Sequence, residues 1–216
     1  MSLTYPDHRL KDKSIAILSK IVTSQRYYDV TDAVVAVTES IFRSEGRIVT
    51  PYDAVTTPLM LHIGEHFYQY LLQDHSLVDV AEVKGTGQLT EEMQSYLAGG
   101  TGRAFQEDLA DFVAKNPVQG IILIGGDDNF YQKGNERCKL ATMRRVLKDC
   151  PVYPLGASGG AAKNLLDNLA DGYEPIEWRY KDLSILELYA NAFDYLSTRI
   201  IDDISGERGK GFLDGL

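Results

Sequence analysis

The chain has 216 residues, of which 44% are hydrophobic and 25% charged, the composition of an ordinary globular domain with a packed core. Its formal net charge of -9 argues against duplex DNA and anionic membranes as partners, because Lys and Arg supply most of the affinity for phosphate-rich surfaces. No apolar run reaches about 18 residues, no signal-like segment opens the sequence, and Cys138 and Cys150 lack CxxC spacing. We therefore expect a cytoplasmic protein without disulfides.

The first half of the chain alternates short apolar runs with segments of helical periodicity. Apolar runs typical of buried strands cover residues 14–19, 47–50 and 77–83. Between them the spacing predicts two helices, the first ending near Gly46 and the second starting at Thr57 and Pro58, with residues 29–32 as the loop before the first helix. The glycine-rich stretch 84–103 forms either an irregular loop or a short helix between two turns.

The second half continues the alternation. Strands are predicted over 120–126 and 151–156, and helices over 105–113, 140–147 and 159–169. A last amphipathic pattern over 185–204 predicts a helix of roughly five turns, which either covers the sheet or pairs with a copy of itself. The fold class is therefore α/β, a doubly wound, Rossmann-like parallel sheet with helices on both faces and an added C-terminal helix. We expect this domain over 1–175 and a helical extension over 176–216.

Ligands of such sheets bind beyond the carboxyl ends of the strands, where the strand order reverses. At one such end, Gly125 and Gly126 would let a ligand approach the backbone while helix N–H groups face an anion. The adjacent Asp127 and Asp128 suit ribose hydroxyls, or less well a Mg²⁺ ion bridging to phosphate. The alternative is a glycine-rich turn with solvated carboxylates.

Two further glycine-rich turns are candidate ligand loops. The segment 156–163 has small residues throughout, which permits close approach of a pyrophosphate or ribose phosphate, but it lacks the ending of a P-loop and so disfavours a kinase or GTPase. The segment Gly99-Gly100-Thr101-Gly102 is followed by Arg103, which could bind a phosphate through two hydrogen bonds. A flexible connector is the alternative for this second turn.

The segment His62-Ile63-Gly64-Glu65-His66 matches H-x-x-E-H, the inverted zinc-protease pattern. On a helical wheel these polar residues lie opposite the apolar stripe, so a solvated helix face explains them as well. The sequence offers no obvious third ligand. A zinc hydrolase is thus a minor alternative, and we expect no resident metal or cofactor.

The order of the predicted elements and the segment Pro151-Val152-Tyr153-Pro154-Leu155-Gly156-Ala157-Ser158-Gly159-Gly160-Ala161-Ala162-Lys163 resemble the SLOG superfamily over about residues 14–170. That group includes the LOG-type, lysine decarboxylase-like phosphoribohydrolases and the nucleotide-sensing domains fused to sirtuin-type and TIR effectors in bacterial defence. The resemblance implies a Rossmannoid sheet that binds a nucleotide or an NAD-derived signal. Its enzymatic branch carries P-G-G-x-G-T-x-x-E after the fourth strand. Here Gly125 and Gly126 match, residues 127–130 replace the G-T portion, and Glu136 is a loosely placed substitute for the Glu.

We predict that the chain binds a nucleotide or an NAD-derived small molecule at the glycine-rich strand ends. One activity is hydrolysis of the N-glycosidic bond, with a carboxylate among Asp127, Asp128 and Glu136 holding ribose hydroxyls or positioning water. The alternative is a non-catalytic sensor, a homo-oligomer whose assembly changes through the C-terminal helix. The predicted ligand-binding residues are Ser19, Thr50, Gly99, Gly100, Thr101, Arg103, Gly125, Gly126, Gly156, Ser158, Gly159 and Gly160.

Overall fold

The computed structural model describes residues 7–22, 27–71, 76–171 and 193–206, which build a six-stranded, entirely parallel sheet. The strand order is β4-β3-β2-β1-β5-β6, so the order reverses between β1 and β5. This confirms the predicted α/β class and the Rossmann-like, doubly wound arrangement. The strands are β1 (Ser14–Lys20), β2 (Arg47–Pro51), β3 (Val78–Ala81), β4 (Gly102–Ala104), β5 (Gly120–Gly125) and β6 (Val152–Leu155).

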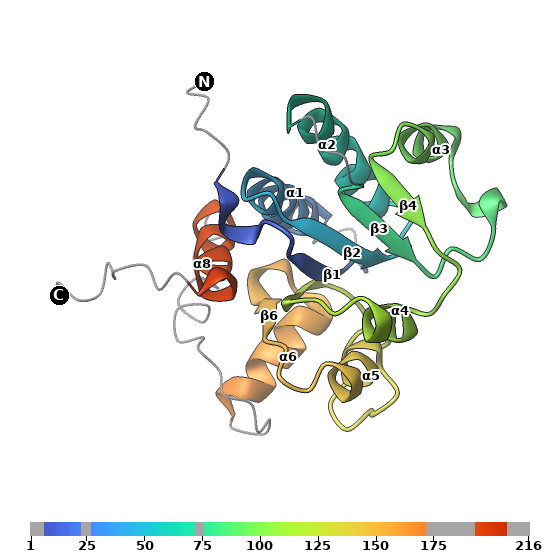
Figure 1. The fold of residues 1–216 in the computed structure, drawn as a ribbon. Helices are drawn as coiled ribbons and strands as arrows, with labels where there is room; N and C mark the ends of the chain where they lie inside the picture. The colour runs from blue at the N-terminus through green and yellow to red at the C-terminus, as the bar shows by residue number, and fades with distance from the viewer. Residues whose placement is uncertain (1–6, 23–26, 72–75, 172–192, 207–216) are drawn as a thin grey trace, which may run out of the picture.

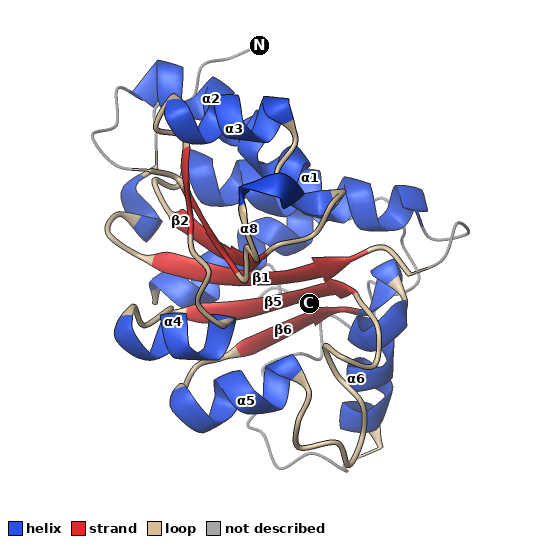
Figure 2. Cartoon of the chain, turned by 90° about the vertical axis from the view of Figure 1, so that its right-hand side faces the viewer, coloured by secondary structure: helices blue, strands red, loops and turns tan. Residues whose placement is uncertain are grey.

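Helices cover both faces of the sheet (Figures 1 and 2). One face carries α1 (Tyr27–Arg43), α2 (Thr56–Leu71), α3 (Glu91–Ala98) and α8 (Phe193–Ser205). The other carries α4 (Leu109–Lys115), α5 (Lys139–Val146) and α6 (Gly160–Ala170). None of the described helices is both long enough and apolar enough to cross a membrane.

The central strands β1 and β5 are apolar over most of their length because both of their faces are covered. In β1, Ile15 and Ile17 join the core beneath α1 and α2, whereas Ala16 and Leu18 join the core on the α4–α6 face. All six residues of β5 are buried. Continuous apolar runs of this kind are characteristic of parallel strands packed between two helical layers.

The first helix begins earlier than the sequence analysis predicted. Residues 29–32 form part of α1, which starts at Tyr27, and the predicted loop there is wrong. Val30 is buried in the core and lies three and four residues before Ala33 and Val34, so the apolar stripe includes it. Asp29, in the first turn, is favourable beside the positive end of the helix dipole.

The glycine-rich stretch 84–103 contains the short helix α3, which was one of the two predicted alternatives. Thr90 caps it, accepting a hydrogen bond at 3.2 Å from the Met93 backbone N–H. The stretch ends in β4, a strand of three residues that the sequence analysis missed. Three residues are too few for an alternating or apolar pattern to be visible.

The following helix, α4, begins at Leu109 behind the cap residue Asp108, so Phe105 precedes the helix and the predicted start at 105 is wrong. The Phe105 ring instead packs against Phe112. Its apolar character, which suggested a helix position, is explained by this contact.

The C-terminal helix α8 packs on α1 and on the short 3-10 helix at His8–Leu10. Its apolar residues Phe193, Leu196, Ile200 and Ile201 belong to the main core. Asp202 forms an ion pair with Arg9, and Asp203 accepts a hydrogen bond at 2.8 Å from the Tyr153 hydroxyl. The described part of the helix therefore covers this chain's own core, whereas the predicted helical residues 185–192 lie outside the described residues.

Candidate functional site

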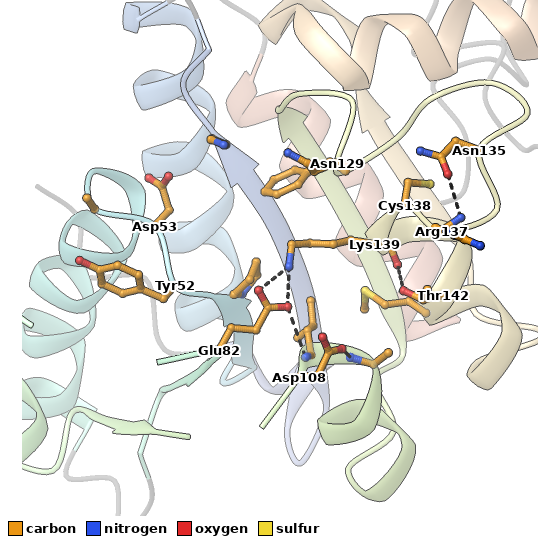
Figure 3. Close-up of a pocket in the computed structure, with 17 residues that line it drawn as sticks. Tyr52, Asp53, Glu82, Asp108, Asn129, Asn135, Arg137, Cys138, Lys139 and Thr142 are labelled. Atoms are coloured by element: carbon orange, nitrogen blue, oxygen red, sulfur yellow. Dashed lines mark hydrogen bonds and ion pairs between the residues drawn. The ribbon is translucent and has the colours of Figure 1, made fainter. Parts of the chain in front are cut away.

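A cavity lies at the carboxyl edge of the sheet, beside the reversal in strand order. Its volume is about 700 Å³, a size common for small-molecule sites. Residues from the ends of β1, β2 and β3 form one side, and the starts of α4 and α5 form the other (Figure 3). At this edge the connections from β1 and β5 leave toward opposite faces, which opens a crevice between them.

Three cationic side chains border this cavity, which we call the main cavity. Lys20 is the last residue of β1, Lys139 is the first residue of α5, and Arg137 lies just before α5. Lys20 Nζ lies 2.6 Å from Asp127 Oδ2, and Lys139 pairs with both carboxylate oxygens of Glu82. The carboxylates of Asp53, Glu82 and Asp108 border the same cavity, so its lining combines three cations with three anions.

Glu82 is the most unusual residue of the main cavity. It follows β3 directly and has φ 61°, a left-handed conformation that costs a residue other than glycine roughly 1–3 kcal/mol. Its carboxylate reaches across to Lys139 (Figure 3) and accepts a weak hydrogen bond, 3.4 Å long, from the Leu109 backbone N–H. The surrounding contacts hold this strained backbone, as is common at functional sites. Glu82 lies outside the strand, because β3 ends at Ala81 and the predicted strand over 77–83 is too long.

Two other carboxylates of the main cavity accept hydrogen bonds from backbone N–H groups at the starts of α2 and α4. Asp53 Oδ1 accepts hydrogen bonds from the backbone N–H groups of Val55 and Thr56, at 3.0 and 2.9 Å. Asp108 Oδ1 accepts one from the Ala110 N–H at 3.0 Å. These contacts satisfy donors that a helix start leaves open. Neither residue was singled out from the sequence.

Asp127 begins the loop after β5 and is held on both of its oxygens. Oδ1 accepts from the Asn129 backbone N–H at 3.0 Å, and Oδ2 accepts from Lys20 Nζ. Partial burial acts to raise the pKa of Asp127, but the hydrogen bond and charge of Lys20, together with the Asn129 contacts, lower it below its usual value. This carboxylate is therefore ionised at neutral pH.

A second cavity of about 370 Å³ lies over the β5 loop and the start of α6. It is bordered by Gly126, Asp127, Asp128, Ser158 and Gly160, so several residues predicted from the sequence come together here. Asp128 is exposed at its rim. The cavity supports the predicted grouping of the two strand-end loops.

The glycines of these loops, however, contact one another. Gly125, Gly126 and Gly160 all have positive φ, and a Cβ on Gly160 would lie 2.4 Å from the Gly126 carbonyl oxygen. That oxygen accepts a hydrogen bond from the Ala161 N–H, one of the first donors of α6, at 3.0 Å. The close approach that glycine permits here thus serves backbone-to-backbone packing.

Five more of the predicted ligand-binding residues make contacts within the protein itself. Ser158 Oγ accepts from the Gly125 N–H and donates to the Leu155 carbonyl. Ser19 is fully buried and donates to Thr56 Oγ1 at 2.9 Å, and Thr50 is buried too. Gly156 and Gly159 bound the turn before α6, joined by a hydrogen bond from the Gly159 N–H to the Gly156 carbonyl.

Glu136 is separated from the other two predicted carboxylates. Its side chain is 85% exposed and pairs at 2.9 Å with Arg145. It borders neither of the two cavities, whereas its neighbours Asn135 and Arg137 border the main one. The structure therefore brings Asp127 and Asp128 to a cavity but leaves Glu136 at the surface.

The turn Gly99–Thr101 precedes β4 and so lies at the amino edge of the sheet, opposite the cavities. Arg103 lies within β4 and binds Asp79 of β3, with both contacts at 2.9 Å; Arg47 of β2 reaches the same carboxylate at 3.1 Å. Asp79 is buried. Arg103 thus joins neighbouring strands and is not brought to the carboxyl edge.

The H-x-x-E-H residues lie on α2 beside α3. His62 Nδ1 is 2.9 Å from the Tyr96 hydroxyl, which donates to Glu92 at 2.6 Å. Burial, with the hydrogen bond and charge of Glu92, raises the pKa of Tyr96 to about 12. Within the described ranges, no group of three or more His, Cys, Asp and Glu is placed to hold a metal ion. The pattern here is explained by a polar contact between two helices.

No protein-family model matches the sequence, and no curated protein is significantly similar to it. The resemblance to the SLOG superfamily accordingly stays a prediction.

Proposed function

We propose that the protein binds a small anionic molecule of the nucleotide class in the main cavity. The observation that carries the proposal is the set of Lys20, Arg137 and Lys139 around a cavity of about 700 Å³ at the reversal of strand order. A protein of net charge -9 repels anions at long range, so capture of a negative group depends on local cations such as these three. Lysine and arginine are the usual partners of phosphate.

The other surfaces of the main cavity suit groups of a nucleotide that lie next to its phosphate. Tyr52 borders it with an aromatic ring whose hydroxyl donates to the Gln88 carbonyl at 2.8 Å, which fixes the ring. Asn129, Asn135 and Thr142 offer amide and hydroxyl groups. Aromatic surface with a few placed polar groups is the usual lining of small-molecule sites.

Hydrolysis of the N-glycosidic bond is a second candidate, supported by Asp127 and Asp128 beside the second cavity. An ionised Asp127 can stabilise the positive charge that develops on a ribose, but it cannot donate a proton to the leaving base. Glu136, at the surface, does not complete the set. Binding is therefore the primary proposal, and a sensor needs binding alone.

Calorimetric titration with AMP, GMP, CMP, UMP, NAD and ADP-ribose tests the proposal. We expect at least one to bind, and Lys139→Ala to weaken that binding at least tenfold. Lys148→Ala is the matched control, because the substitution removes the same charge at an exposed position that borders neither cavity. No binding by any of the six, or equal losses in the two variants, would refute the proposal. Release of free base, followed by chromatography, distinguishes turnover from sensing.

A further inference from the structure

The two cavities meet at one ion pair. Lys20 borders the main cavity, Asp127 borders the second, and Asn129 borders both. The 2.6 Å contact between Lys20 Nζ and Asp127 Oδ2 therefore lies at the junction between them. A ligand longer than one cavity would cross this junction.

The two sides of the junction differ in charge. The main cavity combines the cations Lys20, Arg137 and Lys139 with the carboxylates of Asp53, Glu82 and Asp108. The described residues that border the second cavity include the carboxylates Asp127 and Asp128 but no Lys or Arg. The apolar side chains of Val22 and Val30 also border it. Carboxylates accept hydrogen bonds from hydroxyl and amino groups, and they repel a second anion.

The junction pair is able to exchange partners. Asp127 keeps the Asn129 backbone hydrogen bond on Oδ1 when Lys20 leaves Oδ2, so the carboxylate stays held. The Lys20 side chain is 39% exposed, which leaves its ammonium group accessible from the main cavity. An anionic group there would compete with Asp127 for Lys20.

We propose that the two cavities form one bipartite site, which takes a molecule that is anionic at one end and uncharged but rich in hydrogen-bond donors at the other. Lys20 contacts the anionic end, and Asp127 and Asp128 receive the uncharged end and exclude a second phosphate. This inference rests on the proposed binding of a nucleotide in the main cavity and adds its orientation and its charge selectivity.

Calorimetry with the tightest-binding of AMP, GMP, CMP and UMP, and with the 3′,5′-bisphosphate of the same nucleoside, tests the inference. We expect the wild-type protein to prefer the monophosphate at least tenfold. Asp128→Asn should reduce that preference at least threefold, because a negative charge near the second phosphate is removed. Asp149→Asn, which removes the same charge at an exposed position bordering neither cavity, should leave the preference unchanged.

Asn164→Lys gives a second, independent test, because Asn164 is an exposed residue of α6 at the second cavity and lysine is a good helix former. It should strengthen bisphosphate binding at least threefold. Monophosphate binding that depends on Lys139, together with equal preferences in the Asp128 and Asp149 variants, would overturn the bipartite site and leave the proposed function standing. Absence of monophosphate binding would overturn both.

Discussion

Glu82 and Lys139 join the end of β3 to the first turn of α5 across the main cavity, and their ion pair helps to hold Glu82 at positive φ. The pair also keeps Lys139 partly neutralised. A ligand anion must therefore compete with Glu82 for this ammonium group. The competition makes Glu82 a negative determinant of anion affinity within the proposed site.

Replacing Glu82 with glutamine should strengthen binding of a nucleotide phosphate, by roughly threefold to tenfold, because the competing charge is removed while the side-chain volume is kept. The same change should lower the free energy of unfolding by about 1 kcal/mol, the usual range for a weakened ion pair and its hydrogen bonds. Calorimetry and urea unfolding measure the two effects. Weaker nucleotide binding by a folded Glu82→Gln protein would show that the carboxylate itself contacts the ligand.

The glycine-rich loops offer a direct test of what their glycines do. Gly160→Ala would place a Cβ 2.4 Å from the Gly126 carbonyl oxygen at φ 59°, so we expect a loss of roughly 2–4 kcal/mol in the free energy of unfolding. Gly134→Ala is the control, because Gly134 also has positive φ, at 75°, but a Cβ there meets nothing within 4 Å. It should cost about 1 kcal/mol. Equal losses in urea unfolding would contradict packing of one loop on the other.

The sheet could be predicted because its strands are buried on both faces. β1 and β5 are continuous apolar runs, which a short window detects, and the helices between strands have a clear apolar stripe. β4 could not be found, since three residues that gain their pairing from β3 have no pattern of their own. The start of α1 was missed because its polar first turn resembles a loop, although Val30 belongs to the apolar stripe.

The site could be predicted only in part. The carboxyl edge followed from the strand and helix alternation, and Gly125, Gly126 and Asp127 lie there. Glu82 and Lys139 are 57 positions apart in the chain, and their contact is created by the sheet order, which no local spacing encodes. The positive φ of Glu82 could not be predicted from its residue type either, because a positive φ is expected at glycine or asparagine and rarely at glutamate.

Arg103 was predicted to bind ligand phosphate, and its contacts with Asp79 suggest a different outcome for Arg103→Ala. Loss of two hydrogen bonds between β4 and β3 should lower the free energy of unfolding by about 1 kcal/mol, because the arginine is half exposed and Arg47 still pairs with the buried carboxylate. Nucleotide affinity should be unchanged. If calorimetry showed that this variant loses as much nucleotide affinity as Lys139→Ala, Arg103 would have to be counted among the ligand-binding residues.

Lys20 lowers the pKa of Asp127, and this effect fixes the sign of a pH dependence. In the folded protein Asp127 should titrate below its ordinary value of 3.8, as followed by NMR of its carboxyl carbon, and Lys20→Ala should move the titration upward. A carboxylate whose pKa is lowered on folding contributes stability above its unfolded pKa and loses it as the pH falls through the folded pKa. The stability difference between wild type and Lys20→Ala should therefore be present at pH 7 and shrink below about pH 4. Because both side chains are partly exposed, that difference should stay under about 1 kcal/mol and fall further in high salt. An Asp127 titration unchanged by Lys20→Ala would mean that the ion pair is not formed in solution, and the junction between the two cavities would then be open.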